Sequence, residues 1–171
     1  MQQEDFMERL TLRKGEKLRH RSLVNPLFKG ANSLYAYPLR IVWRTLSEEQ
    51  LAETFCGHVP SAIGSLQMMI TVPKKKRRHA VDRVTMRRRI REAYRLNRLP
   101  LKHKLEDSGE ARTLSMSIIY ISDKNEPSAL VHARMRKLLA RIEAEISAPL
   151  SPAAHSGAES AAGESPSISH A

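Results

Sequence analysis

The spacing of hydrophobic residues changes several times along this chain, and each change predicts a new element of secondary structure. Apolar residues recur at helical spacing over 16–28, where Pro26 predicts a kinked or two-part helix. Over 33–46 apolar and polar residues alternate, which predicts a strand or a strand pair broken near Pro38. Residues 47–65 contain acids, glycines and a proline and are expected to form a connection.

The second half of the chain alternates strands with helices. Apolar runs predict strands over 66–72 and 114–121, and helical spacing predicts helices over 80–105 and 128–146. Pro100 predicts that the first of these helices ends or bends just before it. Its expected buried stripe consists of Met86, Ile90, Ala93, Tyr94, Asn97 and Leu101. The order helix, strands, helix, strand, helix predicts an α+β fold, an α/β sandwich with a small central sheet.

Composition sets the limits of the folded part. Residues 148–171 are rich in Ser, Ala, Pro and Gly, cannot bury much apolar surface, and are predicted to be disordered. Residues 1–10 are polar and are predicted to be flexible, which leaves 11–147 as one domain. The single Cys56 excludes an internal disulfide framework and suits the cytoplasm. No apolar run is long enough to span a bilayer, so no membrane location is expected.

Positive charge is concentrated in one place. Residues 73–98 hold 12 of the 29 Lys and Arg residues and two acids, while the rest of the chain carries 17 bases and 16 acids. Arginines one helical turn apart (Arg87, Arg91 and Arg95) repel one another, and Arg suits bidentate phosphate contacts. The alternatives are a solvated helix face, a nuclear localisation signal and a membrane-surface helix. Binding of a polyanion explains the density of charge best.

No pattern typical of a protein active site is present. The chain lacks a glycine-rich phosphate loop, a zinc-protease motif and a nucleophile elbow. Cys56 and His58 have no matching pair of metal ligands elsewhere, so a loop thiol beside a loop imidazole is the simpler interpretation. Catalysis by this chain alone is not expected.

The basic stretch resembles the signature of the bacterial ribonuclease P protein family. That signature, Lys-x-x-x-Ala-Val-x-Arg-Asn-x-x-Lys-Arg-x-x-Arg, aligns with residues 76–91, and similar family features stand at 27–30 and 37–40. Val84 and Thr85 replace the Asn and the second Arg of the family's Arg-Asn-Arg core, and Arg87 replaces a Lys.

The resemblance implies a fold, a reaction and partners. The fold would have a parallel strand pair joined by a left-handed crossover. The protein would bind the catalytic RNA subunit of ribonuclease P, which removes the 5′ leader of precursor tRNA with bound Mg2+, and would need no obligate protein partner. The residues assigned to RNA contact are Lys74, Lys75, Lys76, Arg83, Arg87, Arg88, Arg91 and Arg95. Those assigned to the leader are Phe28, Tyr37, Arg40 and Trp43, with Trp43 preferred as a platform for a base.

Two alternatives belong to other classes. A structural RNA-binding protein, such as a ribosome-associated protein or an RNA chaperone, would bind RNA without promoting leader cleavage. A DNA-binding module is disfavoured because the basic helix follows a strand rather than a short helix-turn-helix pair.

Overall fold

A four-stranded sheet is the centre of the computed structural model, which describes residues 11–107 and 112–147. The strand order is β1-β2-β4-β3. The elements in chain order are η1 (Lys14–Glu16), α2 (Arg21–Leu27), β1 (Asn32–Ala36), β2 (Leu39–Ser47), α3 (Glu48–Thr54), β3 (Leu66–Thr71), α4 (Ala80–Asn97), α5 (Leu99–Asp107), β4 (Arg112–Tyr120) and α6 (Ser128–Ser147). The predicted α+β class is confirmed.

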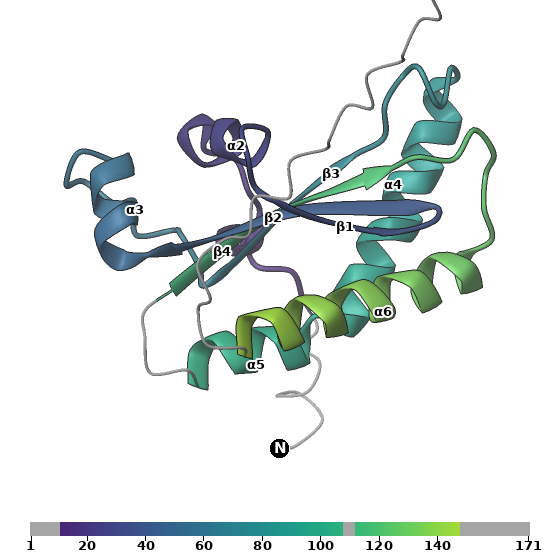
Figure 1. The fold of residues 1–171 in the computed structure, drawn as a ribbon. Helices are drawn as coiled ribbons and strands as arrows, with labels where there is room; N and C mark the ends of the chain where they lie inside the picture. The colour runs from purple at the N-terminus through teal and green to yellow at the C-terminus, as the bar shows by residue number, and fades with distance from the viewer. Residues whose placement is uncertain (1–10, 108–111, 148–171) are drawn as a thin grey trace, which may run out of the picture.

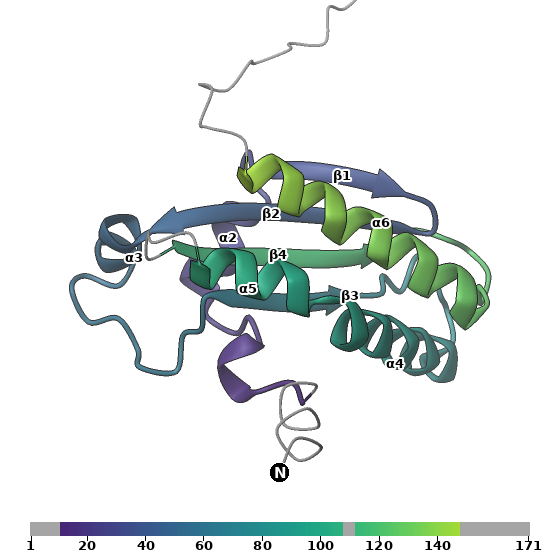
Figure 2. The same cartoon turned by 90° about the horizontal axis from the view of Figure 1, so that it is seen from below.

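The sheet combines antiparallel and parallel pairs. β1 and β2 form a hairpin around Tyr37 and Pro38, as the alternating pattern with its central proline predicted. β2 also pairs antiparallel with β4, whereas β3 and β4 are parallel and are joined through α4 and α5. In Figure 2 both parallel strands point to the right, the connecting helices pass in front, and β4 lies above β3. The crossover is therefore left-handed, which is rare for parallel strands.

The main core lies on one face of the sheet. The layer formed by α4, α5 and α6 covers this face (Figures 1 and 2). Alternate residues of β2 and β4, such as Ile41 and Met116, are buried in the same cluster as side chains of these helices. Met86, Ile90 and Tyr94 of α4 are fully buried there, as the helical stripe predicted. This packing fixes which side of α4 faces outward.

A smaller core lies on the opposite face. α2 and α3 lie on that side of the sheet in Figure 1, and their leucines pack with side chains of β2 and its neighbours. The residues of this core are Leu18, Leu23, Leu27, Leu46 and Leu51. Because these helices are short, part of the sheet beside α2 stays accessible, with Tyr35 exposed and Arg40 half-buried.

Two predictions for the N-terminal half are corrected. The predicted helix over 16–28 is a short 3-10 turn ending at Glu16, an extended segment and then α2, which begins only at Arg21. The extended segment pairs with β3 instead, through a bridge between Lys17 and Met68. The predicted connection over 47–65 contains a helix, α3.

The remaining elements agree with the pattern. The long helical segment breaks between Asn97 and Leu99, just before Pro100, to give α4 and α5. Within the described residues no helix is long and apolar enough to cross a membrane. The predictions for 1–10 and 148–171 lie outside the described residues.

Candidate nucleic-acid interface

The outward face of α4 carries the cations that the sequence singled out. Arg87, Arg88 and Arg91 are exposed, as are Lys74 and Lys75 in the turn between β3 and α4. In the parts of the chain that the structure describes, none of these five side chains makes a hydrogen bond or an ion pair. Their charges are therefore available to an external anion.

The other three residues assigned to RNA contact, Lys76, Arg83 and Arg95, have partners within the protein. Lys76 lies 3.3 Å from Asp123 and Arg95 lies 2.6 Å from Glu92, in both cases as ion pairs at the surface. The hydrogen bonds from Arg95 hold the pKa of the Glu92 carboxyl below its ordinary value. Surface pairs of this kind are worth at most about 1 kcal/mol, so a phosphate can compete for either cation.

Arg83 has a different surrounding. It is half-buried, and its Nη1 donates to the backbone carbonyls of Arg77 and Arg78, at 3.0 and 2.6 Å. Arg83 thus holds the turn that leads from β3 into α4. These bonds support a role for Arg83 in positioning the basic turn, in addition to its predicted contact with RNA phosphates.

Sequence reasoning missed a second group of basic residues that fasten the helix. Arg77 forms an ion pair with Asp82 at 2.7 Å, and Arg89 donates to the Glu126 carbonyl at 2.6 Å. The hydrogen bond that Asn125 donates, together with the charge of Arg77, holds the pKa of the Asp82 carboxyl below its ordinary value. The loop 121–127 is therefore tied to the first turns of α4. The only signal of such pairs in the sequence was the two acids within the basic stretch, Asp82 and Glu92.

Val84 and Thr85, which stand where the family signature has Asn and Arg, lie on the first turns of α4. Val84 is exposed on α4, and the Thr85 hydroxyl donates to the Val81 carbonyl at 3.0 Å. Neither side chain carries a charge, so the outward charge of this part of α4 comes from Arg87, Arg88 and Arg91.

The residues assigned to the leader do not gather in one cleft, and Trp43 is a correction. Trp43 is 4% exposed and packs in the main core, because alternation along β2 places it on the same face as Leu39 and Ile41. Arg40 and Arg44, its neighbours in sequence, point to the opposite face. A base platform at Trp43 is therefore wrong.

The other three aromatic or basic positions are accessible to different degrees. Phe28 directly follows α2 and is 56% exposed. Tyr37 is 55% exposed at the hairpin turn, where its hydroxyl donates to Ser122 Oγ at 2.8 Å. Arg40 lies with its guanidinium 4.9 Å from the ring centroid of Tyr35, its cross-strand partner. Tyr35, which sequence reasoning did not select, is 57% exposed and gives this face an aromatic surface.

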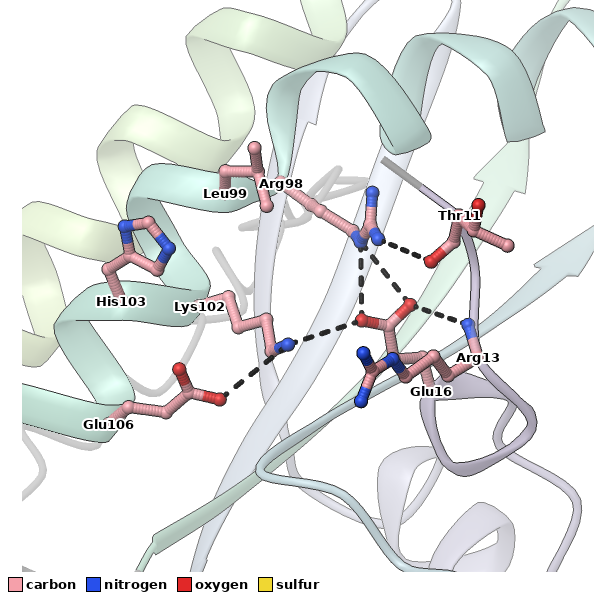
Figure 3. A pocket seen from close by; sticks show the side chains of 8 residues that line it. All are labelled: Thr11, Arg13, Glu16, Arg98, Leu99, Lys102, His103 and Glu106. Carbon is pink, nitrogen blue, oxygen red and sulfur yellow. Dashed lines mark hydrogen bonds and ion pairs between the residues drawn. The ribbon is translucent and has the colours of Figure 1, made fainter. Parts of the chain in front are cut away.

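A buried ion pair holds the N-terminal segment beside α4 (Figure 3). The Glu16 carboxylate accepts from Arg98 Nε and from the Arg13 backbone N–H, with Lys102 Nζ 3.8 Å away. Arg98 also donates to the Thr11 carbonyl at 2.9 Å. Both members of the pair are almost fully buried, at 5% and 1% exposure. The segment 11–17 is thus fixed against the junction of α4 and α5.

Comparison with known proteins decides the family. A sequence model of the family described as Ribonuclease P matches residues 12–143. The chain belongs to the ribonuclease P protein family. It is 34% identical over 137 residues to the ribonuclease P protein components of two strains of Porphyromonas gingivalis, W83 and ATCC 33277, covering 79% of this chain and 88% of theirs. Membership supports a role in tRNA 5′-end processing and does not favour a structural RNA-binding protein without a processing role.

A solved structure is also similar to this chain. The Staphylococcus aureus RNase P protein is 15% identical, with a TM-score of 0.49, and the match covers 75% of this chain and 95% of that one.

Within the described residues, no three His, Cys, Asp or Glu side chains gather into a group suited to a metal ion.

Proposed function

We propose that this chain is the protein subunit that binds the catalytic RNA of ribonuclease P and the 5′ leader of precursor tRNA in the cytoplasm. The RNA subunit, with Mg2+ bound mainly to it, supplies the active site. The chain contributes affinity and position. Family membership supports the assignment to the holoenzyme, and the cations of α4 support the contact with RNA.

The observation that carries the proposal is a set of exposed cations without a partner in the described part of the protein. In the described ranges, the side chains of Lys74, Lys75, Arg78, Arg87, Arg88 and Arg91 are exposed and make no hydrogen bond or ion pair. Like charges this close destabilise the free protein, and each can neutralise one phosphate when RNA binds. The main core packs against the inner side of α4, so the backbone that carries Arg87, Arg88 and Arg91 is held in place.

The leader is assigned to the face of the sheet beside α2. Tyr35 and Arg40 are cross-strand partners there, and Phe28 lies at the end of α2. Exposed aromatic rings stack on unpaired bases, and the guanidinium of Arg40 can meet the backbone of the same strand. Tyr37, at the hairpin turn, stays assigned to the leader as a contact at the end of this face.

Magnesium is left to the RNA. The acids nearest the basic surface, Asp82 and Glu92, each bind an arginine of this chain, and no cluster of three ligands stands in the described part. These residues do not suit a divalent ion, whose preferred ligands are several oxygens around one centre. In this proposal the chain contributes to the reaction by binding and orienting RNA.

The test is stimulation of leader cleavage. The purified chain is added to folded catalytic RNA at low Mg2+, and cleavage of precursor tRNA is followed. Stimulation by the wild-type chain, reduced in Arg88→Gln and retained in the matched α6 variant Arg141→Gln, supports the proposal. Absence of stimulation by wild-type chain with RNA shown to be folded excludes it.

A further inference from the structure

A small groove runs between the free edge of β3 and the outward side of α4. Its volume is about 150 Å3, smaller than the pockets that take drug-sized ligands. Met68 and Ile70 of β3 and Leu12 of the N-terminal segment line it, with Arg87 and Arg91 on the α4 side. The groove therefore has room for one ring system between apolar and cationic walls.

The edge of β3 offers unused backbone groups in this groove. β3 is an edge strand, and the N-terminal segment pairs with it at Met68, whose carbonyl accepts from the Leu18 N–H at 2.9 Å. Backbone groups of residues two apart point to the same side of a strand, so the N–H and C=O of Ile70 face the open edge. Among the described residues, none pairs with Ile70 on that side. A ligand with a donor and an acceptor on one edge can use both groups.

The charge around the groove is positive. Arg87, Arg91 and Lys17 are exposed and have no ion-pair partner in the ranges that the structure describes. Glu16 also lines the groove, but its carboxylate is buried and bound by Arg98. The net field therefore favours an anionic group beside the apolar floor.

We propose that this groove binds one unpaired nucleotide of RNA. The base lies on Ile70, Met68 and Leu12 with its polar edge at the Ile70 backbone, and the flanking phosphates lie on Arg87 and Arg91. A paired base is stacked in its helix and keeps its polar edge hidden, so only a bulged or looped nucleotide can enter. The inference rests on the proposed function, because it specifies what the α4 surface recognises in its RNA partner.

The test uses the full chain and two RNA hairpins. One hairpin carries a single unpaired 2-aminopurine, and the other has the same nucleotide paired. The wild-type chain is expected to bind the first hairpin about fivefold to tenfold more tightly than the second. This ratio lies at the lower end of the affinity gained when a protein side chain holds one base. The fluorescence of the unpaired 2-aminopurine should rise as it leaves its neighbours in the stack.

Variants separate the groove from the charge around it. Ile70→Ala should abolish most of the preference while affinity for the paired hairpin changes less than about twofold, since only apolar contact is lost. Leu12→Ala should act in the same way and replaces Ile70→Ala if that variant unfolds. The matched control Leu96→Ala, an apolar residue of α4 that is 44% exposed outside the groove, should keep the preference.

Two results overturn the inference. Equal affinity of wild-type chain for the two hairpins is one, and it would leave the edge of β3 open to a protein strand instead. A preference that survives both Ile70→Ala and Leu12→Ala is the other. In either case stimulation of leader cleavage by the wild-type chain would still stand, so the proposed function is tested separately.

Discussion

Arg83 and Arg87 lie one helical turn apart on α4, yet their side chains have different surroundings. Arg83 is bonded to the carbonyls of the preceding turn, whereas Arg87 is exposed without a partner in the described residues. We expect Arg83→Gln to lower the free energy of unfolding by about 1–2 kcal/mol, because two charged hydrogen bonds are lost. Arg87→Gln should leave it almost unchanged and weaken RNA binding. Denaturant unfolding and RNA titration of both variants, side by side, measure the difference, and equal stability of the two would contradict it.

Trp43 and Tyr35 give a second contrast between residues. Trp43→Ala removes a large side chain from the main core and should cost about 3–5 kcal/mol of stability. Tyr35→Ala removes an exposed ring and should leave the melting temperature within about 2 °C of wild type. Its effect should appear in affinity for precursor tRNA with a leader, compared with mature tRNA. A similar loss for both tRNAs would show that Tyr35 does not contact the leader.

The sequence could predict which residues are basic or aromatic but could not say which were accessible. Along β2, Trp43 alternates onto the same face as Leu39 and Ile41, yet which face is buried depends on helices far away in the chain. Likewise, Arg83 and Arg91 look alike in the sequence. Only the position of the turn before α4 decides that one is bonded to backbone and the other is exposed.

At the scale of elements, the ionised Asp82 contributes to the attachment of loop 121–127 to α4 through its bond from Asn125. Its pKa is lowered in the folded state, from an ordinary value near 3.8, so its contribution to stability is present above that value and is lost as pH falls through the lower folded value. Asp82→Asn should therefore reduce the melting temperature near neutral pH, and its difference from wild type should shrink as pH falls below the ordinary pKa of the carboxyl. Glu145→Gln, an exposed acid on α6, is the control and should show no such convergence. A constant difference between wild type and Asp82→Asn across the range would contradict the expectation.

The buried Glu16–Arg98 pair determines where the N-terminal segment lies. Glu16→Gln leaves Arg98 buried without a countercharge and should cost about 3–5 kcal/mol, measured by chemical unfolding. Replacing both residues by Met removes the unpaired charge as well, so the double variant should recover a large part of that loss. If the double variant loses as much stability as Glu16→Met and Arg98→Met lose together, the ion pair is itself a major source of stability.

The elements differed in how well local sequence predicted them. Apolar spacing predicted β3 and α6, because each packs a continuous apolar face on the main core. Pro100 predicted the break between α4 and α5. α3 was missed although Ser47 and Gln50 form a capping box, with the Gln50 N–H donating to Ser47 Oγ. The helix over 16–28 was predicted too long because Glu16 binds Arg98 and Lys17 pairs with β3, contacts with residues distant in sequence.

For the whole molecule, the strand order and the left-handed crossover could not be worked out from local patterns. Parallel pairing of β3 with β4 joins segments that are far apart in the chain, and general rules favour the opposite hand. The resemblance of the basic stretch to a family implied the parallel pair and the left-handed crossover, whereas the strand order came from the structure. What the chain itself supplied was the concentration of charge, and the crossover places that charge on one helix at the edge of the sheet.

The final prediction concerns the salt dependence of binding, which reports the charge of the whole surface. If the six exposed cations Lys74, Lys75, Arg78, Arg87, Arg88 and Arg91 each neutralise a phosphate, log affinity should fall with log salt at a slope of about −4 to −5. Arg91→Gln should make the slope shallower by about one, and Arg83→Gln by less, because Arg83 is engaged with the backbone. The measurement is titration of catalytic RNA over a range of monovalent salt. A slope near about −1 for wild type would mean that these cations remain solvated when RNA binds.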